Sequence, residues 1–392
     1  MAKIVFFCIP AHGHTNPTLG VVRELVRRGH SVWYYSYDAF REKIEATGAT
    51  FVSCQAYDSQ LRLSPADSIR VVKDVGFSLQ VLADSALAME ASLCAQLRSL
   101  QPDCIVGDSM ALWARGIADK LHVPFVCSIT TFAFNRYSAR VMQSDLAGMF
   151  RMLLAMPRAK KQLKRLQAAG YPFRTVLDVI SCDDSLPTVV YTSPQFQPCS
   201  ETFSDKVHFV GPSVRPVEKP FAKPGTPLVY LSMGTVHDDL PAVYQACLEG
   251  LADSGCHLVV SAGACADKVR AMVLSPNVQV FERVDQMAVL QQADVFISHC
   301  GMNSVNESLY CGVPLVMLPQ TSEQTGVANR VAQLHAGIRA EKATPTAILT
   351  AVQTVLTDPS YRQNAAKLRE SFLSCPGAAG AADVILAFCQ KM

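Results

Sequence analysis

The sequence lacks a strong excess of either charge and lacks any regular spacing of its cysteines. Its 35 Lys and Arg residues and 33 Asp and Glu residues leave a net charge of +2 over 392 residues, which excludes the strongly basic composition of a nucleic-acid or anionic-membrane binder. The 14 cysteines include no Cys-x-x-Cys pair, which argues against a zinc module and a disulfide framework. We therefore expect buried thiols in a cytoplasmic, reducing environment.

The start of the sequence lacks a long apolar segment. The apolar run 4–10 follows a single lysine and is interrupted by His12 and His14, so it is too short for a signal peptide or a membrane span. We interpret this run as the first strand of a sheet, in a protein that does not span a membrane.

Short apolar runs alternate with amphipathic segments along the chain. Strand patterns occur first at residues 4–9, 31–36, 50–54, 104–108, 125–129 and 189–192, with helix patterns at 17–28, 39–47 and 81–99. Further strand patterns follow at residues 228–233, 257–262, 278–283, 295–298 and 314–318. This alternation predicts an α/β fold built on parallel, doubly wound sheets.

The length and a proline-rich segment predict two domains. Residues 212–227 carry five prolines and little apolar periodicity, which is typical of an interdomain linker. The N-terminal domain is then 1–211 and the C-terminal domain 228–392. Because polar turns follow the carboxyl ends of parallel strands, we expect these Rossmann-like domains to face each other across a ligand-binding cleft.

Polar residues follow one predicted strand of the second domain at the point where it ends. His299 and Gly301 lead into a helix that is expected to open at Asn303 and Ser304. A helix N-terminus attracts anions through its unpaired N–H groups, and an imidazole beside it adds a donor for a diphosphate. Glu307 lies on the same helical face, where a carboxylate can accept hydrogen bonds from both ribose hydroxyls.

A second polar pair, Glu323 and Gln324, follows the strand predicted at 314–318. An acceptor and an amide side by side suit the hydroxyls of a sugar ring. The structural alternative is a buried histidine at His299, a solvated helix charge at Glu307 and an ordinary helix cap between them.

These residues together resemble the donor-binding signature of the family 1 UDP-glycosyltransferases, in particular the bacterial macrolide glycosyltransferase group. The matching positions are Arg283, Val284, Gln286, His299, Gly301, Asn303, Ser304, Glu307, Glu323 and Gln324. The resemblance implies the GT-B fold, an acceptor-binding first domain, a UDP-sugar as co-substrate and no separate cofactor. It also implies that the last helix, near 379–390, crosses back to the first domain.

The catalytic residues are expected in the first domain. His14 stands in a His-Gly-His segment after the first strand, and the resemblance matches it to the family's general base. Asp108 ends the fourth strand and matches the aspartate that orients the base. For His12 we favour local packing, and the alternative for Asp108 is a cap on the helix predicted at 111–121.

Transfer by these residues would invert the anomeric carbon, because no clear pair of acids offers the nucleophile of a retaining enzyme. The sequence contains no Asp-x-Asp, the usual cue for manganese, so no metal is expected. Instead His299, the helix start and Thr235, in a glycine-threonine turn, are expected to neutralise the leaving diphosphate.

Four positions depart from the family pattern. Arg283 replaces a tryptophan that stacks on uracil in many members, and a planar guanidinium can stack as well. Asp285 replaces a frequent proline, Met302 a tryptophan of plant members, and Val327 an asparagine behind the sugar site.

The acceptor pocket is expected after the fifth strand, in a segment rich in methionine, leucine and aromatic residues. Its candidate residues are Phe132, Phe134, Tyr137 and Met142. Core packing is the alternative for most of this segment, while flexible methionines suit a loosely defined apolar ligand. We expect a hydroxylated polyphenol, macrolide, sterol or terpenoid as acceptor, and glucose as the sugar, because Gln324 is typical of glucosyl-transferring members.

Two other functions remain open from the sequence. A UDP-sugar epimerase or hydrolase on the same fold would turn over the sugar without an acceptor. A nucleotide-sugar binding protein would lack a working His14 and Asp108 pair. In each case we expect a monomer or weak dimer.

Overall fold

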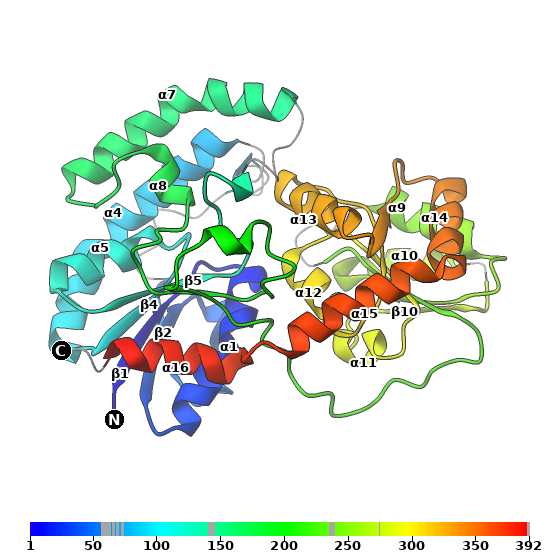
Figure 1. Cartoon of the computed structure of the whole chain (residues 1–392), viewed down its shortest axis with the longest axis horizontal. Coiled ribbons are helices and arrows are strands. Elements are labelled where there is room, and N and C mark those ends of the chain that lie inside the picture. The colour runs from blue at the N-terminus through cyan, green and yellow to red at the C-terminus, as the bar shows by residue number, and fades with distance from the viewer. Residues whose placement is uncertain are drawn as a thin grey trace. The chain divides into compact units, whose positions relative to one another are not determined.

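A computed structural model gives the architecture of the protein (Figure 1). It describes residues 1–55, 64, 67, 70–71, 74–139, 146–234, 240–273 and 275–389. The chain divides into two compact units, one made of Met1–Ser213 with Cys375–Met392 and the other of Val214–Ser374. The segment that contains the last helix therefore belongs to the first unit, to which the family resemblance implied that it crosses back.

Parallel strands form the sheet of the first unit. Among the described residues its order is β3-β2-β1-β4-β5-β6-β7. The strands are β1 Lys3–Phe7, β2 Ser31–Ser36, β3 Thr50–Ser53, β4 Cys104–Asp108, β5 Phe125–Ile129, β6 Thr188–Val190 and β7 Val207–Phe209. Because the strand order reverses between β1 and β4, these two strands flank the switch point of the sheet.

Helices cover both faces of this sheet (Figure 1). They are α1 His12–Arg27, α2 Arg41–Glu45, α4 Val75–Leu100, α5 Leu112–Leu121, α7 Leu146–Ala168, α8 Val176–Ile180 and α16 Gly377–Cys389, with short 3-10 turns at Asp38–Phe40 and Ser200–Thr202. Side chains of β1 alternate between the two faces: Val5 and Phe7 pack in the core beneath α4, α5 and α7, while Ile4 and Phe6 pack in the core beneath α1 and α16.

Helix α1 begins five residues earlier than the sequence predicts. Its first residue is His12, after Ala11 in extended conformation, and Pro17 lies inside the helix. The expected start at Pro17 was wrong because a proline so near the N-terminus removes only one helical N–H, and the preceding residues still form the first turn. This early start places His14 on a helix rather than in a loop.

The last helix, α16, packs against α1 within the first unit. Nη1 of Arg28 lies 2.5 Å from Oδ1 of Asp383, and Nη2 donates to the carbonyl of Ala379 at 3.1 Å. Nε of Arg28 also donates to Glu24 at 2.7 Å. Hydrogen bonds from Arg27 and Arg28 lower the pKa of Glu24 to about 2, so this acidic link stays charged across the neutral range.

The second unit holds another parallel sheet. Among its described residues the order is β10-β9-β8-β11-β12-β13. The strands are β8 Leu228–Ser232, β9 His257–Ser261, β10 Val278–Phe281, β11 Val295–Ser298, β12 Leu315–Met317 and β13 Gly337–Arg339. The helices are α9 Pro241–Leu251, α10 Ala266–Met272, α11 Gln286–Leu290, α12 Met302–Tyr310, α13 Ser322–Gln333, α14 Pro345–Thr357 and α15 Pro359–Leu373, with a 3-10 turn at Gly263–Cys265. Its switch point lies between β8 and β11.

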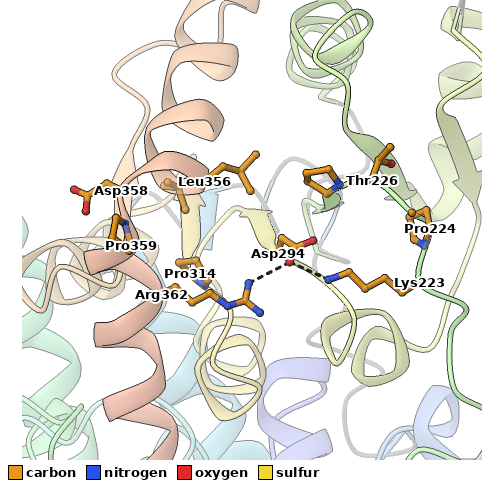
Figure 2. Close-up of a pocket in the computed structure, with 12 residues that line it drawn as sticks. Lys223, Pro224, Thr226, Asp294, Pro314, Leu356, Asp358, Pro359 and Arg362 are labelled. Atoms are coloured by element: carbon orange, nitrogen blue, oxygen red, sulfur yellow. Dashed lines mark hydrogen bonds and ion pairs between the residues drawn. The ribbon is translucent and has the colours of Figure 1, made fainter.

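At the amino edge of this second sheet, one carboxylate holds the proline-rich segment to the unit (Figure 2). Oδ1 of Asp294 accepts from Nζ of Lys223 at 2.9 Å and from Nη1 of Arg362 at 3.2 Å. Its Oδ2 accepts from the N–H of Leu228 at 2.9 Å. Lys223, Asp294 and Arg362 line a pocket of about 430 Å³ that contains none of the site residues predicted from the sequence.

By length and composition alone, one helical stretch of the described residues, Pro359–Cys389, is apolar enough to cross a membrane. It consists of α15 and α16, and each has a buried side. Tyr361 of α15 packs in the core of the second unit, and Ala381 and Ile385 of α16 pack in the core of the first.

Both units are parallel-sheet α/β folds, which confirms the predicted fold class.

Candidate active site

The switch point of the first sheet brings His14 and Asp108 together. His14 is the third residue of α1, which follows β1, and Asp108 is the last residue of β4. Nδ1 of His14 lies 2.7 Å from Oδ2 of Asp108, and both side chains are largely withdrawn from solvent, with 18% and 1% of their surface exposed. In the tautomer that carries its proton on Nδ1, the imidazole donates to this carboxylate and presents a lone pair on Nε2.

Two further contacts hold this pair. Oδ1 of Asp108 accepts from the N–H of Met110 at 2.9 Å, so both carboxylate oxygens are engaged. The hydroxyl of Thr130 lies 3.1 Å from Nδ1 of His14. Sequence reasoning missed Thr130, although its position directly after β5, at the same sheet edge, is a signal that could have found it.

The other histidine of this turn lies apart from the pair. His12 is exposed, and its ring meets the ring of Phe40 edge-on with centroids 4.9 Å apart.

Cys8 is fully buried, and its burial, followed by the negative charge of Asp108, raises the pKa of its thiol. Cys8 thus remains protonated and is not a nucleophile.

In the second unit, His299 lies directly after β11, between two glycines. A Cβ atom built on Gly234 would lie 2.6 Å from Cε1 and Nε2 of the imidazole, and one on Gly301 would lie 2.5 Å from Nε2. Gly234 also has a φ of +79°, which any L side chain adopts with strain. Both positions therefore require glycine so that the imidazole can lie against the backbone turns.

Helix α12 opens beside this imidazole. Gly301 is its N-cap residue, and the helix begins at Met302, one residue before the predicted start, so Asn303 and Ser304 stand in its first turn. Cys300, just before the helix, has a φ of +66°, and its N–H is held by the hydroxyl of Ser298 at 3.1 Å. The N–H groups of this first turn precede the intrahelical hydrogen bonds, and donors of this kind can bind an anion.

Glu307 belongs to a hydrogen-bonded cluster on α12. Nε2 of Gln286 donates to its Oε2 at 2.6 Å and lies 3.4 Å from Oγ of Ser304. The hydroxyl of Tyr230 donates to Oε1 of Gln286 at 3.3 Å. Burial raises the pKa of Glu307, while the hydrogen bond from Gln286 opposes that shift. No sequence signal pointed to Tyr230, which reads as an ordinary strand residue.

The segment between β10 and α11 carries the remaining nucleotide candidates. Arg283 is exposed and Val284 is half-buried. Asp285, which replaces the family proline, caps α11 by accepting from the N–H of Met287 at 3.1 Å, and it lies 3.3 Å from Nη2 of Arg215. A capping carboxylate thus starts α11.

The two sugar-site candidates lie in the first turn of α13. Glu323 is exposed, whereas Gln324 is buried and its Oε1 accepts from the N–H of Gln320 at 2.8 Å. Thr321 caps the helix through the N–H of Gln324 at 3.2 Å. Val327 is fully buried, so an apolar contact takes the place of the asparagine of other members.

The acceptor candidates separate into core and surface residues. Phe132 is 1% exposed and packs against Phe196 with ring centroids 5.2 Å apart, so its side chain has no surface to offer a ligand. Phe134 is half-buried and Tyr137 is 40% exposed. Met142 lies outside the described residues, as does the phosphate-site candidate Thr235.

Metal ligands do not gather in the part of the chain that the structure describes: no group of three His, Cys, Asp or Glu side chains there could hold an ion. Two of the diphosphate donors predicted from the sequence, His299 and the first turn of α12, lie close together in the second unit.

Comparison with known proteins extends these observations to the whole chain. Residues 219–373 match the family model described as UDP-glucoronosyl and UDP-glucosyl transferase. The chain is 31% identical to the NDP-glycosyltransferase YjiC of Bacillus subtilis (strain 168), over 98% of this chain and 96% of that protein. It is 30% identical to the demethyllactenocin mycarosyltransferase of Streptomyces fradiae, over 98% and 86% of the two chains.

A solved structure shows the same fold. The glycosyltransferase of kitacinnamycin aligns with a TM-score of 0.84 and 28% identity, over 99% of this chain and 98% of that one. The GT-B architecture expected from the sequence is thus confirmed, and so is the activity class, a glycosyltransferase that uses a nucleotide sugar. The chain belongs to the family 1 UDP-glycosyltransferases.

Proposed function

We propose that the protein transfers glucose from UDP-glucose to a hydroxyl group of a small hydrophobic acceptor, with inversion at the anomeric carbon and without a metal ion. The observation that carries this proposal is the 2.7 Å hydrogen bond between His14 and Asp108 at the switch point of the first sheet. A histidine held in this way is equipped to remove a proton from an attacking hydroxyl.

The acceptor is activated by the imidazole. Nε2 of His14 takes the hydroxyl proton while the acceptor oxygen attacks the anomeric carbon from the face opposite UDP. Asp108 keeps the ring in the required tautomer and stabilises the imidazolium that forms. One displacement without a covalent intermediate inverts the configuration at that carbon.

The donor is held by the second unit. The N-terminal turn of α12 and the imidazole of His299 bind the diphosphate and stabilise the charge that develops on it as the bond to the sugar breaks. Glu307 accepts hydrogen bonds from the ribose hydroxyls, and Arg283 stacks on the base. Fixed donors of this kind, together with the absence of an Asp-x-Asp motif from the sequence, support a reaction without a metal.

Glucose is the proposed sugar because Glu323 and Gln324 stand together at the start of α13. The amide and the carboxylate recognise the sugar hydroxyls. Relatives whose names specify other sugars, such as the mycarosyltransferase, make the identity of the sugar the part of the proposal to test first. The relatives named above are transferases, and they lend no support to the epimerase or hydrolase alternative.

The acceptor class is a hydroxylated polyphenol, macrolide, sterol or terpenoid, in keeping with the name of the mycarosyltransferase relative. Phe134 and Tyr137, on the segment after β5, are the acceptor contacts that we propose among the described residues. We expect a monomer or weak dimer in the cytoplasm, where the fourteen free thiols remain reduced.

A direct experiment tests the proposal. The protein is incubated with UDP-glucose, with and without a panel of hydroxylated aglycones, while UDP release and product mass are measured. UDP release that depends on an acceptor, with a product heavier by one hexose and a β-linkage from the α-linked donor, is the expected result. Equal UDP release without an acceptor would point to hydrolysis and overturn the transfer proposal.

A further inference from the structure

We propose that Tyr230 is a positioning residue for the nucleotide. Its hydroxyl orients the amide of Gln286, and that amide holds Glu307 in place to bind the two hydroxyls of a ribose. The consequence is selectivity for a ribonucleotide donor over a deoxyribonucleotide donor. This inference rests on the proposed role of Glu307 in ribose binding and adds the residues that make that role selective.

The ring of Tyr230 is fixed within the second sheet. It lies in β8, is 1% exposed, and stacks on Phe296 of the neighbouring strand with centroids 4.9 Å apart and planes inclined by 13°. Burial raises the pKa of its phenol, so the hydroxyl keeps its proton and can donate it.

The amide of Gln286 can point either way, and its neighbours select one orientation. The Tyr230 hydroxyl donates to Oε1 at 3.3 Å, and Nε2 donates to the Glu307 carboxylate at 2.6 Å. A flipped amide would set Oε1 against the carboxylate, which is unfavourable for two acceptors. Loss of the tyrosine hydroxyl removes the donor that stabilises the observed orientation, and leaves the amide without its anchor on the sheet.

The carboxylate of Glu307 is the end of this chain of hydrogen bonds. Gln286 engages Oε2, and we assign the ribose hydroxyls to the Oε1 side. Because the Glu307 side chain is half-buried, a nucleotide without these hydroxyls leaves a partly desolvated carboxylate without those partners, which costs more than a missing apolar contact. A carboxylate that is free to rotate would discriminate less, because it can find other partners.

The test compares two nucleotides on two variants. Tyr230→Phe keeps the stacked ring and removes only the hydroxyl. Dissociation constants are measured by calorimetry for UDP and for 2′,3′-dideoxyuridine diphosphate. We expect the variant to bind UDP roughly 3- to 10-fold more weakly, the effect of one neutral hydrogen bond, and to bind the dideoxy nucleotide as the wild type does. The matched control is Tyr361→Phe, a buried tyrosine of the same unit stacked on His335, which should change neither constant.

Further variants separate the possible outcomes. Gln286→Met breaks the same chain without touching β8, so it should reproduce the selective loss for UDP even if Tyr230→Phe folds poorly. Glu307→Gln tests the ribose site itself and should bring the two constants together. If Glu307→Gln does so but Tyr230→Phe and Gln286→Met weaken both nucleotides equally, or neither, the positioning role is refuted while the ribose site stands. If Glu307→Gln leaves the ratio unchanged, the ribose assignment is wrong.

Discussion

Nδ1 of His14 lies 2.7 Å from Oδ2 of Asp108, although 94 positions of sequence separate the two residues. The contact exists because β1 and β4 are neighbouring parallel strands, and both residues follow or end these strands at the carboxyl edge of the sheet. A buried carboxylate on one ring nitrogen directs the chemistry of the histidine to the other.

Removing the imidazole should slow the chemical step and leave donor binding intact. We expect His14→Ala to lower the turnover number by roughly 10²- to 10⁴-fold, the usual contribution of a general base, with an unchanged dissociation constant for UDP. Steady-state kinetics with a hydroxyl acceptor and calorimetry with UDP measure the two effects. The matched control is His12→Ala, an exposed histidine two residues away that packs on Phe40. Near-normal turnover of His14→Ala would refute the assignment.

Removing the imidazole of the second unit should instead weaken UDP itself. His299→Ala loses a proposed hydrogen bond to a charged phosphate, which is worth about 1.5–3 kcal/mol, or tenfold or more in the dissociation constant. His257→Ala, at the amino end of β9, is the control and should bind UDP normally. Saturating EDTA should not reduce turnover of the wild type. Loss of activity on chelation that manganese or magnesium restores would contradict the metal-free mechanism.

Gly234 should be required for UDP binding for a reason that can be separated from backbone strain. Gly234→Ala places a Cβ 2.6 Å from the His299 ring, so we expect weaker UDP binding in addition to a loss of stability of about 1–2 kcal/mol from the left-handed backbone. Gly255→Ala is the matched control, because its φ of +74° is similar and no heavy atom lies within 4 Å of its added Cβ. Thermal unfolding and UDP calorimetry on both variants distinguish the two causes. Normal UDP affinity in Gly234→Ala would show that the imidazole tolerates displacement.

The affinity for UDP should fall as the pH is lowered. This fall should begin at a higher pH than it would with a glutamate of ordinary pKa. Burial raises the pKa of Glu307, so its carboxylate becomes protonated at a higher pH and then accepts hydrogen bonds from the ribose hydroxyls less well. Glu307→Gln should lack this component, and the difference between the two pH profiles removes the contribution of the phosphate. Protonation of Glu307 has the opposite effect on the stability of the fold. Because the folded-state pKa is raised, the contribution of Glu307 to stability is present below its unfolded pKa and is lost as the pH rises through the folded pKa.

Substitutions at the start of α13 should change the sugar preference and spare the nucleotide. Glu323→Ala and Gln324→Ala should reduce transfer from UDP-glucose while barely changing the affinity for free UDP, because a site built to bind hydroxyls discriminates strongly when its polar groups lose their partners. Gln333→Ala, at the exposed far end of the same helix, is the control. A wild-type preference for UDP-galactose or UDP-N-acetylglucosamine would refute the glucose assignment.

The sequence alone determined the α/β class, most strands of both sheets and the residues worth testing. Buried parallel strands carry continuous apolar runs such as those of β1 and β11, and turn residues at their ends are visible locally. The predicted start of helix α1 was too late because it relied on the preference of proline for the first helical position, here Pro17. The short strands β7 and β13 were missed because their residues, Val-His-Phe and Gly-Ile-Arg, form no continuous apolar run.

Long-range packing, and not the local sequence, determines which of these residues act together. Thr130 reaches His14 and Tyr230 reaches Gln286 because the folded sheets bring distant segments together; the sequence indicates where strands end but not which segments become neighbours. The packing also shows that Phe132 is a core residue. The sequence could not decide this, because a phenylalanine in a loop has the same local pattern whether it faces a ligand or another ring. Local pattern thus determined the elements and their end residues, whereas long-range contacts determined the hydrogen-bond partners on which the chemistry depends.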